Sequence, residues 1–314
     1  MNVHFTRRQL FVIAVGAALV LAAALAFFLR SGLIREPAAP GYVAVIRIDG
    51  ALYGGEDAGG LLAQQQGTAS ERVMRELREA RLDPQARAVL LRLNTPGGSA
   101  AAAQEIAEEV DKVRSAGKPV VVSMGDLCAS AGYWIASRGD YLFASPASLT
   151  GSIGVYIDYN NVEELLDKLG VYNEKIKSGA HKDILSMFRP MTDDERAMLQ
   201  RMVDDIYQQF VRTVADGRRM DEADVRALAD GRLFTGRQAL DAGLVDAVGN
   251  YYDALNYAGE RAGLGDGDIP VHSYGEARPL AGLFASDMNE MGRRMADGMV
   301  DRLTQAAGGA PAVR

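Results

Sequence analysis

A serine and a small set of proton acceptors are the residues of this chain whose chemistry stands out. Ser130 lies in the stretch Gly-Asp-Leu-Cys-Ala-Ser-Ala-Gly-Tyr-Trp, residues 125–134. A serine hydroxyl is a weak nucleophile until a nearby base takes its proton. With such a base, and with backbone N–H groups to stabilise negative charge, Ser130 has the chemistry for acyl transfer. The competing interpretation is a small residue that lets a helix pack tightly on a strand.

The chain contains few candidates for the base. Of its three histidines, His4 precedes a long apolar stretch and His272 follows the predicted core. His181 and its neighbour Lys182 remain. The ordinary pKa of lysine is about 10.4, but burial in an apolar site disfavours the charged form and allows lysine to act as a neutral base. The residues alone leave both candidates open, together with the interpretation that both are solvated loop residues.

A second nucleophile has to be considered beside the serine. Cys128 is the only cysteine of the chain, so an intramolecular disulfide is excluded. It lies two residues before Ser130, where a thiol nucleophile is conceivable. A lone cysteine is more often a small buried hydrophobic residue.

Two predicted elements meet at Ser130. The apolar run 119–124 predicts a buried strand and residues 129–137 predict a helix, with Gly125 and Asp126 as the turn between them. Ser130 is therefore expected in the first turn of a helix that begins where a buried strand ends. That position offers unpaired backbone N–H groups and a positive local field.

Strands and helices alternate through the rest of the body, which predicts an α/β fold. Further strands are expected at 43–48, 88–93, 141–144 and 172–176, a Gly-rich turn at 149–155, and a loop rich in Gly, Ala and Gln at 49–67. Helices are expected at 70–81, 100–116, 162–169, 193–215, 221–229, 234–240 and 253–262. Thr192 and Glu195 form a capping-box pattern at the start of the longest helix.

The N-terminal region predicts a membrane anchor. Residues 10–29 are uncharged and almost entirely apolar, a length that suits a bilayer-spanning helix. No small-residue cleavage site follows, so an uncleaved single-pass anchor is expected after a short tail, 1–9. This tail favours a body outside the cytoplasm. Residues 30–41 predict a short linker containing Pro37 and Pro40.

The remaining composition limits the partners. The chain has 314 residues, 48% of them hydrophobic, and a formal net charge of −7 without a local basic patch, so nucleic-acid binding is not expected. The main domain is expected at 42–265. The tail at 266–314 contains a Met- and Arg-rich amphipathic stretch, 279–306, whose role the sequence leaves open between a partner helix, a membrane-surface helix and a loose tail.

Five separated segments resemble the signal peptide peptidase A family, whose members are membrane-anchored serine proteases with the Clp protease/crotonase-like fold. Over about residues 42–260 the matches are, in order, a Pro-Gly-Gly turn at 94–98, a nucleophile segment at 129–133, a Gly-Ser-x-Gly turn at 150–154, a base segment at 177–183 and a helix-entry pattern at 230–239. Each match alone is weak. Their order behind a predicted membrane segment is specific, and implies repeated strand-strand-helix units.

The resemblance implies roles for particular residues. Ser130 corresponds to the nucleophile and Lys182 to the general base, and Ser152 supplies a hydroxyl to the lysine amine. The N–H of Gly97, with that of Gly98, corresponds to the oxyanion donor. Many relatives have Gly-Gly after the serine, whereas this chain has Ala131-Gly132, which questions whether the N–H of residue 131 helps the oxyanion.

The resemblance also implies substrates and assembly. Released signal peptides and other short apolar peptides at the membrane face are the expected substrates, with no cofactor and no metal. Relatives form homo-oligomers, and in some of them the serine and the lysine come from different subunits. The serine protease would then require neighbouring copies of the chain.

Three alternatives remain beside this prediction. A membrane-bound Clp-class protease acting on a stomatin-like partner would share the serine and lysine. A crotonase-like acyl-CoA enzyme would use the glycine turns for a thioester oxyanion and would need neither Lys182 nor an anchor. A non-catalytic membrane scaffold would need none of these groups.

Overall fold

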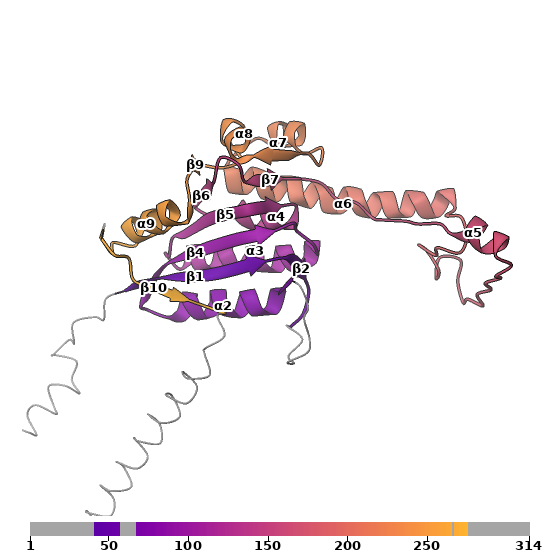
Figure 1. Cartoon of the computed structure of the whole chain (residues 1–314), viewed down its shortest axis with the longest axis horizontal. Coiled ribbons are helices and arrows are strands. Elements are labelled where there is room, and N and C mark those ends of the chain that lie inside the picture. The colour runs from indigo at the N-terminus through magenta and orange to yellow at the C-terminus, as the bar shows by residue number, and fades with distance from the viewer. Residues whose placement is uncertain (1–40, 57–66, 266, 276–314) are drawn as a thin grey trace, which may run out of the picture. The chain divides into compact units, whose positions relative to one another are not determined.

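The computed structural model describes residues 41–56, 67–265 and 267–275. Described residues up to His272 belong to one compact unit. Figure 1 labels the helices and strands of this unit.

Three predictions fall on residues that the structure does not describe. The apolar stretch 10–29, the linker 30–41 apart from its last residue, and the amphipathic stretch 279–306 lie outside the described residues. Within the described part, none of the helices combines the length and the apolar character needed to cross a bilayer.

A mostly parallel sheet of eight strands forms the centre of the unit, which confirms the predicted α/β fold. The strand order is β10-β1-β4-β5-β6-β9, with β7 paired in parallel to the end of β5 and β8 antiparallel to β7. A second, two-stranded sheet joins β2 to β3. The strands are β1 (Tyr42–Asp49), β2 (Ala51–Tyr53), β3 (Gly67–Ala69), β4 (Ala86–Thr95), β5 (Val120–Ala129), β6 (Tyr141–Ala144), β7 (Leu149–Gly151), β8 (Leu233–Thr235), β9 (Ala247–Val248) and β10 (Val271–Ser273).

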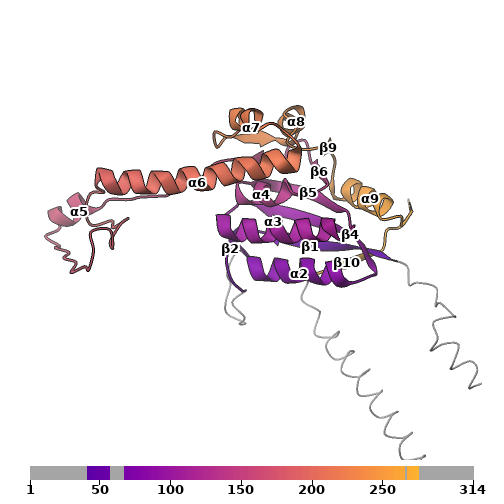
Figure 2. The ribbon, with the colours of Figure 1, turned by 180° about the vertical axis from the view of Figure 1, so that it is seen from behind.

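Helices cover both faces of this sheet, as Figures 1 and 2 show from opposite sides. The helices are α2 (Ser70–Leu82), α3 (Ala100–Ser115), α4 (Ala131–Ala136), α5 (Glu163–Lys168), α6 (Asp193–Arg218), α7 (Glu222–Leu228), α8 (Gly236–Asp241) and α9 (Tyr251–Arg261). The predicted helices at 70–81, 100–116 and 193–215 correspond closely to α2, α3 and α6. The predicted capping box of Thr192 and Glu195 is present.

Alternation of side chains along the strands builds two buried layers. Val45 and Leu90 pack in one cluster with Ala254 and Ala258 of α9. Ile46, the neighbour of Val45, is also fully buried, and must point to the opposite face, where α2 and α3 pack on the sheet. The sheet is thereby fixed on both faces, and the C-terminal end of β5 is a rigid base for the residues that follow it.

Strand β5 is longer than the sequence predicts. Gly125 and Asp126, predicted as a turn, lie inside the strand, which continues to Ala129. Its register with β4 shifts here, and the side-chain Oδ1 of Asn94 accepts the N–H of Leu127 at 3.2 Å. A side-chain oxygen replaces a backbone partner, so the strand passes the irregularity without turning.

Two other predictions are wrong. Residues 49–67, predicted as a loop, contain β2, because Ala51–Tyr53 pair with β3. Residues 172–176, predicted as a strand, have no regular structure and are exposed. A strand needs a neighbour for its backbone hydrogen bonds, and this segment pairs with none in the described part of the chain.

Helix α6 links the sheet to a segment that we call the arm, residues 156–192. Near the C-terminal end of α6, Phe210 stacks on Trp134 of α4 with ring centroids 4.7 Å apart. At its N-terminal end, Glu195 accepts hydrogen bonds from Arg189 of the arm. In both Figure 1 and Figure 2, α5 of the arm lies beside the start of α6 and α4 lies beside its other end.

Candidate active site

Ser130 joins strand β5 to helix α4 in a strained conformation. It is the N-cap residue of α4 with φ 52° and ψ −123°, a combination that residues other than glycine rarely adopt. Its N–H donates to the carbonyl of Gly151 at 2.9 Å, and its carbonyl accepts the N–H of Trp134 at 3.0 Å. The predicted position at a strand-to-helix junction is confirmed. Strain of this kind persists only where the surroundings enforce it, and it often marks a functional site.

The turn containing Gly97 and Gly98 lies against Ser130. A Cβ atom placed on Gly97 would lie 2.8 Å from the Ser130 Cβ and 2.9 Å from the N of Ala131, so only glycine fits there. The N–H of Gly97 donates to Thr95 Oγ1 at 3.0 Å. This bond occupies the donor that the resemblance assigned to the oxyanion.

Two other N–H groups beside Ser130 remain available. Neither the N–H of Gly98 nor that of Ala131 donates a hydrogen bond within the described part of the chain. Ala131 is the first residue of α4, where N–H groups have no partner inside the helix. The next residue, Gly132, must be glycine because its Cβ would meet the Thr95 methyl group at 2.6 Å. Gly98 and Ala131 both line the pocket, and their free N–H groups make them the candidates for oxyanion donors.

Ser152 lies in a second positive-φ turn, at 50°, directly after β7. Its N–H donates to the carbonyl of Arg232 at 2.8 Å. Gly151 before it has φ 79°, and a Cβ there would meet the ring of Phe234 at 2.6 Å. The pairing of β7 with β8 thus fixes the backbone from which the Ser152 hydroxyl projects.

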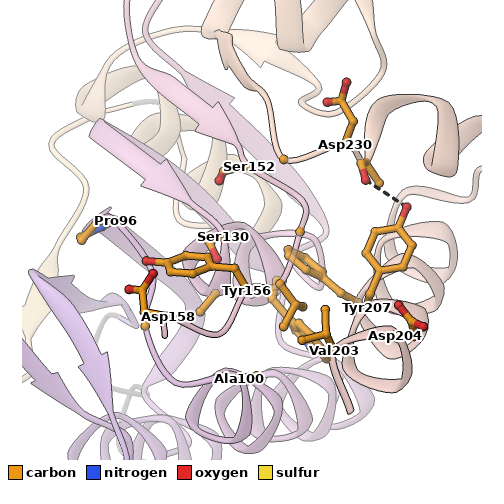
Figure 3. A pocket seen from close by; sticks show the side chains of 18 residues that line it. Pro96, Ala100, Ser130, Ser152, Tyr156, Asp158, Val203, Asp204, Tyr207 and Asp230 are labelled. Atoms are coloured by element: carbon orange, nitrogen blue, oxygen red, sulfur yellow. Dashed lines mark hydrogen bonds between the residues drawn. The ribbon is translucent and has the colours of Figure 1, made fainter. Parts of the chain in front are cut away.

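Ser130 and Ser152 line one pocket of about 930 Å³. Figure 3 shows both serines in this pocket, with Val203, Asp204 and Tyr207 on the side formed by α6. The Tyr207 hydroxyl donates to the carbonyl of Ala229 at 2.9 Å. The pocket is lined by Pro96, Gly98, Ala100, Ser130, Ala131, Trp134, Ser152, Gly154, Val155, Tyr156, Asp158, Val203, Asp204, Tyr207, Phe210, Ala229, Asp230 and Gly231. Its wall combines apolar and aromatic side chains with two serines and three aspartates, and no described residue that lines it is a histidine, lysine or arginine.

Cys128 is not placed to act as a nucleophile. Its side chain is fully buried, and burial raises the pKa of its thiol well above the usual range. A thiol that stays protonated in an apolar environment is unreactive. Cys128 is a small core residue beneath the serine, as the alternative interpretation of the sequence expects.

Lys182 and His181 lie in the arm, away from the pocket. Lys182 is exposed and does not line the pocket. The imidazole of His181 lies 3.7 Å from Asp194 and 3.9 Å from Glu195, in the first turn of α6. Val203, the first α6 residue of the pocket, is about 12 Å further along the helix at ~1.5 Å per residue. Within one chain, the structure brings Ser130, Ser152 and the glycine turn together and does not bring Lys182 to them.

Comparison with known proteins places these residues in a family. Residues 112–265, which include Ser130, Ser152 and Lys182, match the model of peptidase family S49. A putative protease of Synechocystis sp. is 40% identical over 212 residues, which are 68% of this chain and 76% of the relative. A putative signal peptide peptidase SppA of Enterococcus faecium is 39% identical over 62% of this chain and 56% of its own length.

The chain belongs to peptidase family S49, the signal peptide peptidase A family. Its relatives differ in length. Protease 4 of Salmonella typhi is 40% identical over 71% of this chain, but the match spans 35% of that protein. This S49 family chain therefore corresponds to about a third of Protease 4 and to three quarters of the cyanobacterial relative.

One solved structure also resembles this S49 chain. It is a mutant of the 1510-N membrane-bound stomatin-specific protease, with 16% identity and a TM-score of 0.49 over 77% of this chain and 99% of that one. A likeness at this level carries no argument about substrate or partner.

The structure adds residues to this S49 site that sequence reasoning missed. Trp134, Tyr207 and Phe210 form the aromatic wall, and their pattern in the sequence is that of ordinary helix residues. Thr95, the last residue of β4, lies within the segment 94–98, but the resemblance assigns it no role. Arg189, which joins the arm to α6, is likewise unmarked, since its two partners lie six residues before and after it.

Proposed function

We propose that the protein is a membrane-anchored serine endopeptidase in which Ser130 of one copy works with Lys182 of another. The observation that carries the proposal is the strained Ser130, which lines a pocket together with Gly98 and Ala131, whose N–H groups are unengaged. Family membership favours peptide hydrolysis over turnover of CoA thioesters. The Clp protease/crotonase-like arrangement suits this assignment, because its parallel strands deliver residues to a common edge of the sheet.

Each residue has a definite role in the proposed reaction. The neutral amine of Lys182 takes the proton of the Ser130 hydroxyl, whose oxygen attacks the peptide carbonyl. The N–H groups of Gly98 and Ala131 stabilise the tetrahedral oxyanion. Lys182 then protonates the leaving amine, and water releases the acyl group from Ser130. The hydroxyl of Ser152 donates a hydrogen bond to the lysine amine and so positions it.

The proposed dyad requires a neighbouring copy because Lys182 does not line the pocket of its own chain. The arm is suited to contact a second copy, since it exposes apolar side chains that a lone soluble segment rarely presents together. The most exposed are Tyr156, Leu165, Leu169, Val171, Tyr172 and Ile176. Docking of this surface on a neighbour would bury it and would bring Lys182 beside Ser130, Trp134 and Phe210. Burial there disfavours the charged form of the amine.

The proposed substrates are released signal peptides and similar apolar, extended peptides. Several relatives are named as proteases, and one is named a signal peptide peptidase. The aromatic wall of Trp134 and Phe210 suits apolar side chains of such a peptide. The predicted anchor at 10–29 would hold the body at the membrane face on the non-cytoplasmic side, where these peptides are released.

Active-site labelling tests the proposal. The full chain in membranes is treated with a fluorophosphonate, beside Ser130→Ala and Lys182→Ala, and cleavage of an apolar signal peptide is followed. Both variants are expected to lose labelling and to lower kcat/KM by at least about 10³-fold, with unchanged folding. Ser178→Ala and Lys168→Ala change exposed residues of the arm and serve as matched controls with full activity. Near-normal turnover by Lys182→Ala would show that the base is another group.

A further inference from the structure

The arm is held to the body by charge rather than by a hydrophobic core. Helix α5 has no buried residue, and residues 170–182 are all exposed. Such a segment has little apolar burial to fix its conformation. Residues of this segment therefore need hydrogen bonds or ion pairs to keep a fixed orientation, because apolar packing does not fix it.

Arg189 supplies these contacts through a two-sided ion pair. Its Nε and Nη2 donate to Asp183 Oδ2 and Oδ1 at 2.9 and 2.8 Å. Its Nη1 and Nη2 donate to Glu195 Oε2 and Oε1 at 2.8 and 2.6 Å. The planar guanidinium therefore binds two carboxylates in bidentate fashion, an arrangement that lysine cannot reproduce.

Both carboxylates are themselves fixed. Glu195 is part of the capping box that begins α6, and its side chain is 3% exposed. Asp183 forms a second ion pair, with Lys177 Nζ at 2.6 Å, and its side chain is 10% exposed. The hydrogen bonds from Arg189 hold the pKa of Asp183 well below its usual range and lower that of Glu195 to about 2. Both groups are ionised at neutral pH, so both carboxylates carry the charge that pairs with Arg189.

Asp183, which these ion pairs hold in place, is adjacent to the proposed base. Asp183 directly follows Lys182, and the N–H of Lys182 donates to the carbonyl of Gly179 at 3.2 Å, closing a tight turn. Lys177 Nζ also donates to the carbonyl of Ala180 at 3.0 Å. The backbone is thus held immediately before and after Lys182, while its side chain forms no hydrogen bond or ion pair in the described structure.

We propose that Arg189 is a positioning residue for catalysis: its bridge between Asp183 and Glu195 sets the direction in which Lys182 leaves the arm and enters the pocket of a neighbouring copy. The inference rests on the proposed function, in which Lys182 is the base. A base that is held in place lowers the barrier of the proton transfer without adding to peptide binding. The bridge therefore acts on kcat.

Steady-state kinetics of the assembled, full-length protein test this role. Arg189→Met and Asp183→Asn are each expected to lower kcat by about 10- to 100-fold and to leave KM within about twofold. The double variant is expected to be no worse than either single one, because both remove the same bridge. Arg189→Lys is expected not to restore kcat. Arg201→Met, which removes an exposed arginine of α6, is the control and is expected to retain full kcat.

The same series includes Lys182→Ala, so that the two proposals fail separately. Full turnover by Lys182→Ala would overturn the assignment of the base and the positioning role with it. An inactive Lys182→Ala beside an Arg189→Met variant of normal kcat would overturn the positioning role alone. A merely structural role predicts instead that Arg189→Met breaks the assembly or lowers kcat only in proportion to the folded fraction, measured by size and by Trp134 fluorescence.

Discussion

Gly97 and Ser130 are so close that a Cβ atom on the glycine would lie 2.8 Å from the Cβ of the serine. The glycine turn and the strained serine therefore fix each other. The φ of 103° at Gly97 allows the turn to close, and the turn supports the backbone on which Ser130 is held. A side chain larger than hydrogen at residue 97 must therefore displace Ser130.

Gly97→Ala is expected to disable the site beyond its effect on stability. The new methyl group meets the Ser130 Cβ and the backbone of residues 129 and 131, so the serine must move. Backbone strain alone costs about 1–3 kcal/mol. Gly117→Ala is the matched control, because Gly117 also has positive φ but has open space around it. Denaturation should show a loss of stability in both variants, and fluorophosphonate labelling should be lost only in Gly97→Ala; equal labelling of the two would contradict the account.

Ser152→Gly should separate stability from activity. Ser152 has φ 50°, which glycine adopts without strain, so the substitution is expected to leave the free energy of unfolding unchanged or to raise it by less than about 1 kcal/mol. Because the hydroxyl is removed from the pocket, kcat is expected to fall as far as in Ser152→Ala. Parallel chemical denaturation and peptide-cleavage assays measure both effects. A Ser152→Gly variant with full kcat would show that this hydroxyl takes no part in the reaction.

Cys128→Ala is expected to retain activity. The thiol is fully buried and its pKa is raised by burial, so it does not form a thiolate beside the serine. Iodoacetamide should modify the wild-type thiol only after unfolding, as mass spectrometry would detect. Modification of the folded protein together with loss of peptide cleavage would instead support a cysteine nucleophile.

The bridge of Arg189 predicts a loss of order in the arm at low pH. The pKa of Glu195 is lowered from 4.5 to about 2, and that of Asp183 is lowered from 3.8. Carboxyls with lowered pKa values stabilise the fold fully above their ordinary values and lose this contribution as pH falls toward the lowered ones. A spin label at Ser178→Cys, in a Cys128→Ala background, should become mobile as pH falls from 4.5 toward about 2.

Arg189→Met in the same background is the control for this titration. Without the guanidinium the label should be mobile at every pH, while Trp134 fluorescence reports whether the sheet remains folded. An identical pH dependence with and without Arg189 would show that the bridge does not order the arm.

The sequence predicts the fold of the site well where the pattern is local. The apolar run before Ser130 and the helix after it placed the serine at their junction, and Thr192 with Glu195 marked the start of α6. The sequence-based prediction failed where a strand is completed by residues that are distant in the sequence. The turn predicted at Gly125 is a strand because Asn94, from another strand, completes its hydrogen bonds.

Other features of the site have no local pattern at all. The N–H of Gly97 donates to Thr95, a contact that depends on the closed shape of the turn. Of the two glycines that the resemblance suggested as donors, Gly98 is the one whose N–H is unengaged. The distance between Lys182 and the pocket follows from the length of α6, which a motif comparison does not measure. The aromatic wall likewise exists only once α4 and α6 pack together.

Mixing two inactive variants tests the central claim most directly. Ser130→Ala keeps Lys182, and Lys182→Ala keeps Ser130, so neither forms a complete site alone. If the two residues act across neighbouring copies, assemblies of equal amounts of both should regain fluorophosphonate labelling and peptide cleavage at about a quarter of wild-type sites, as random head-to-tail pairing gives. Mixed assemblies of normal size that stay as inactive as their parents would contradict the account.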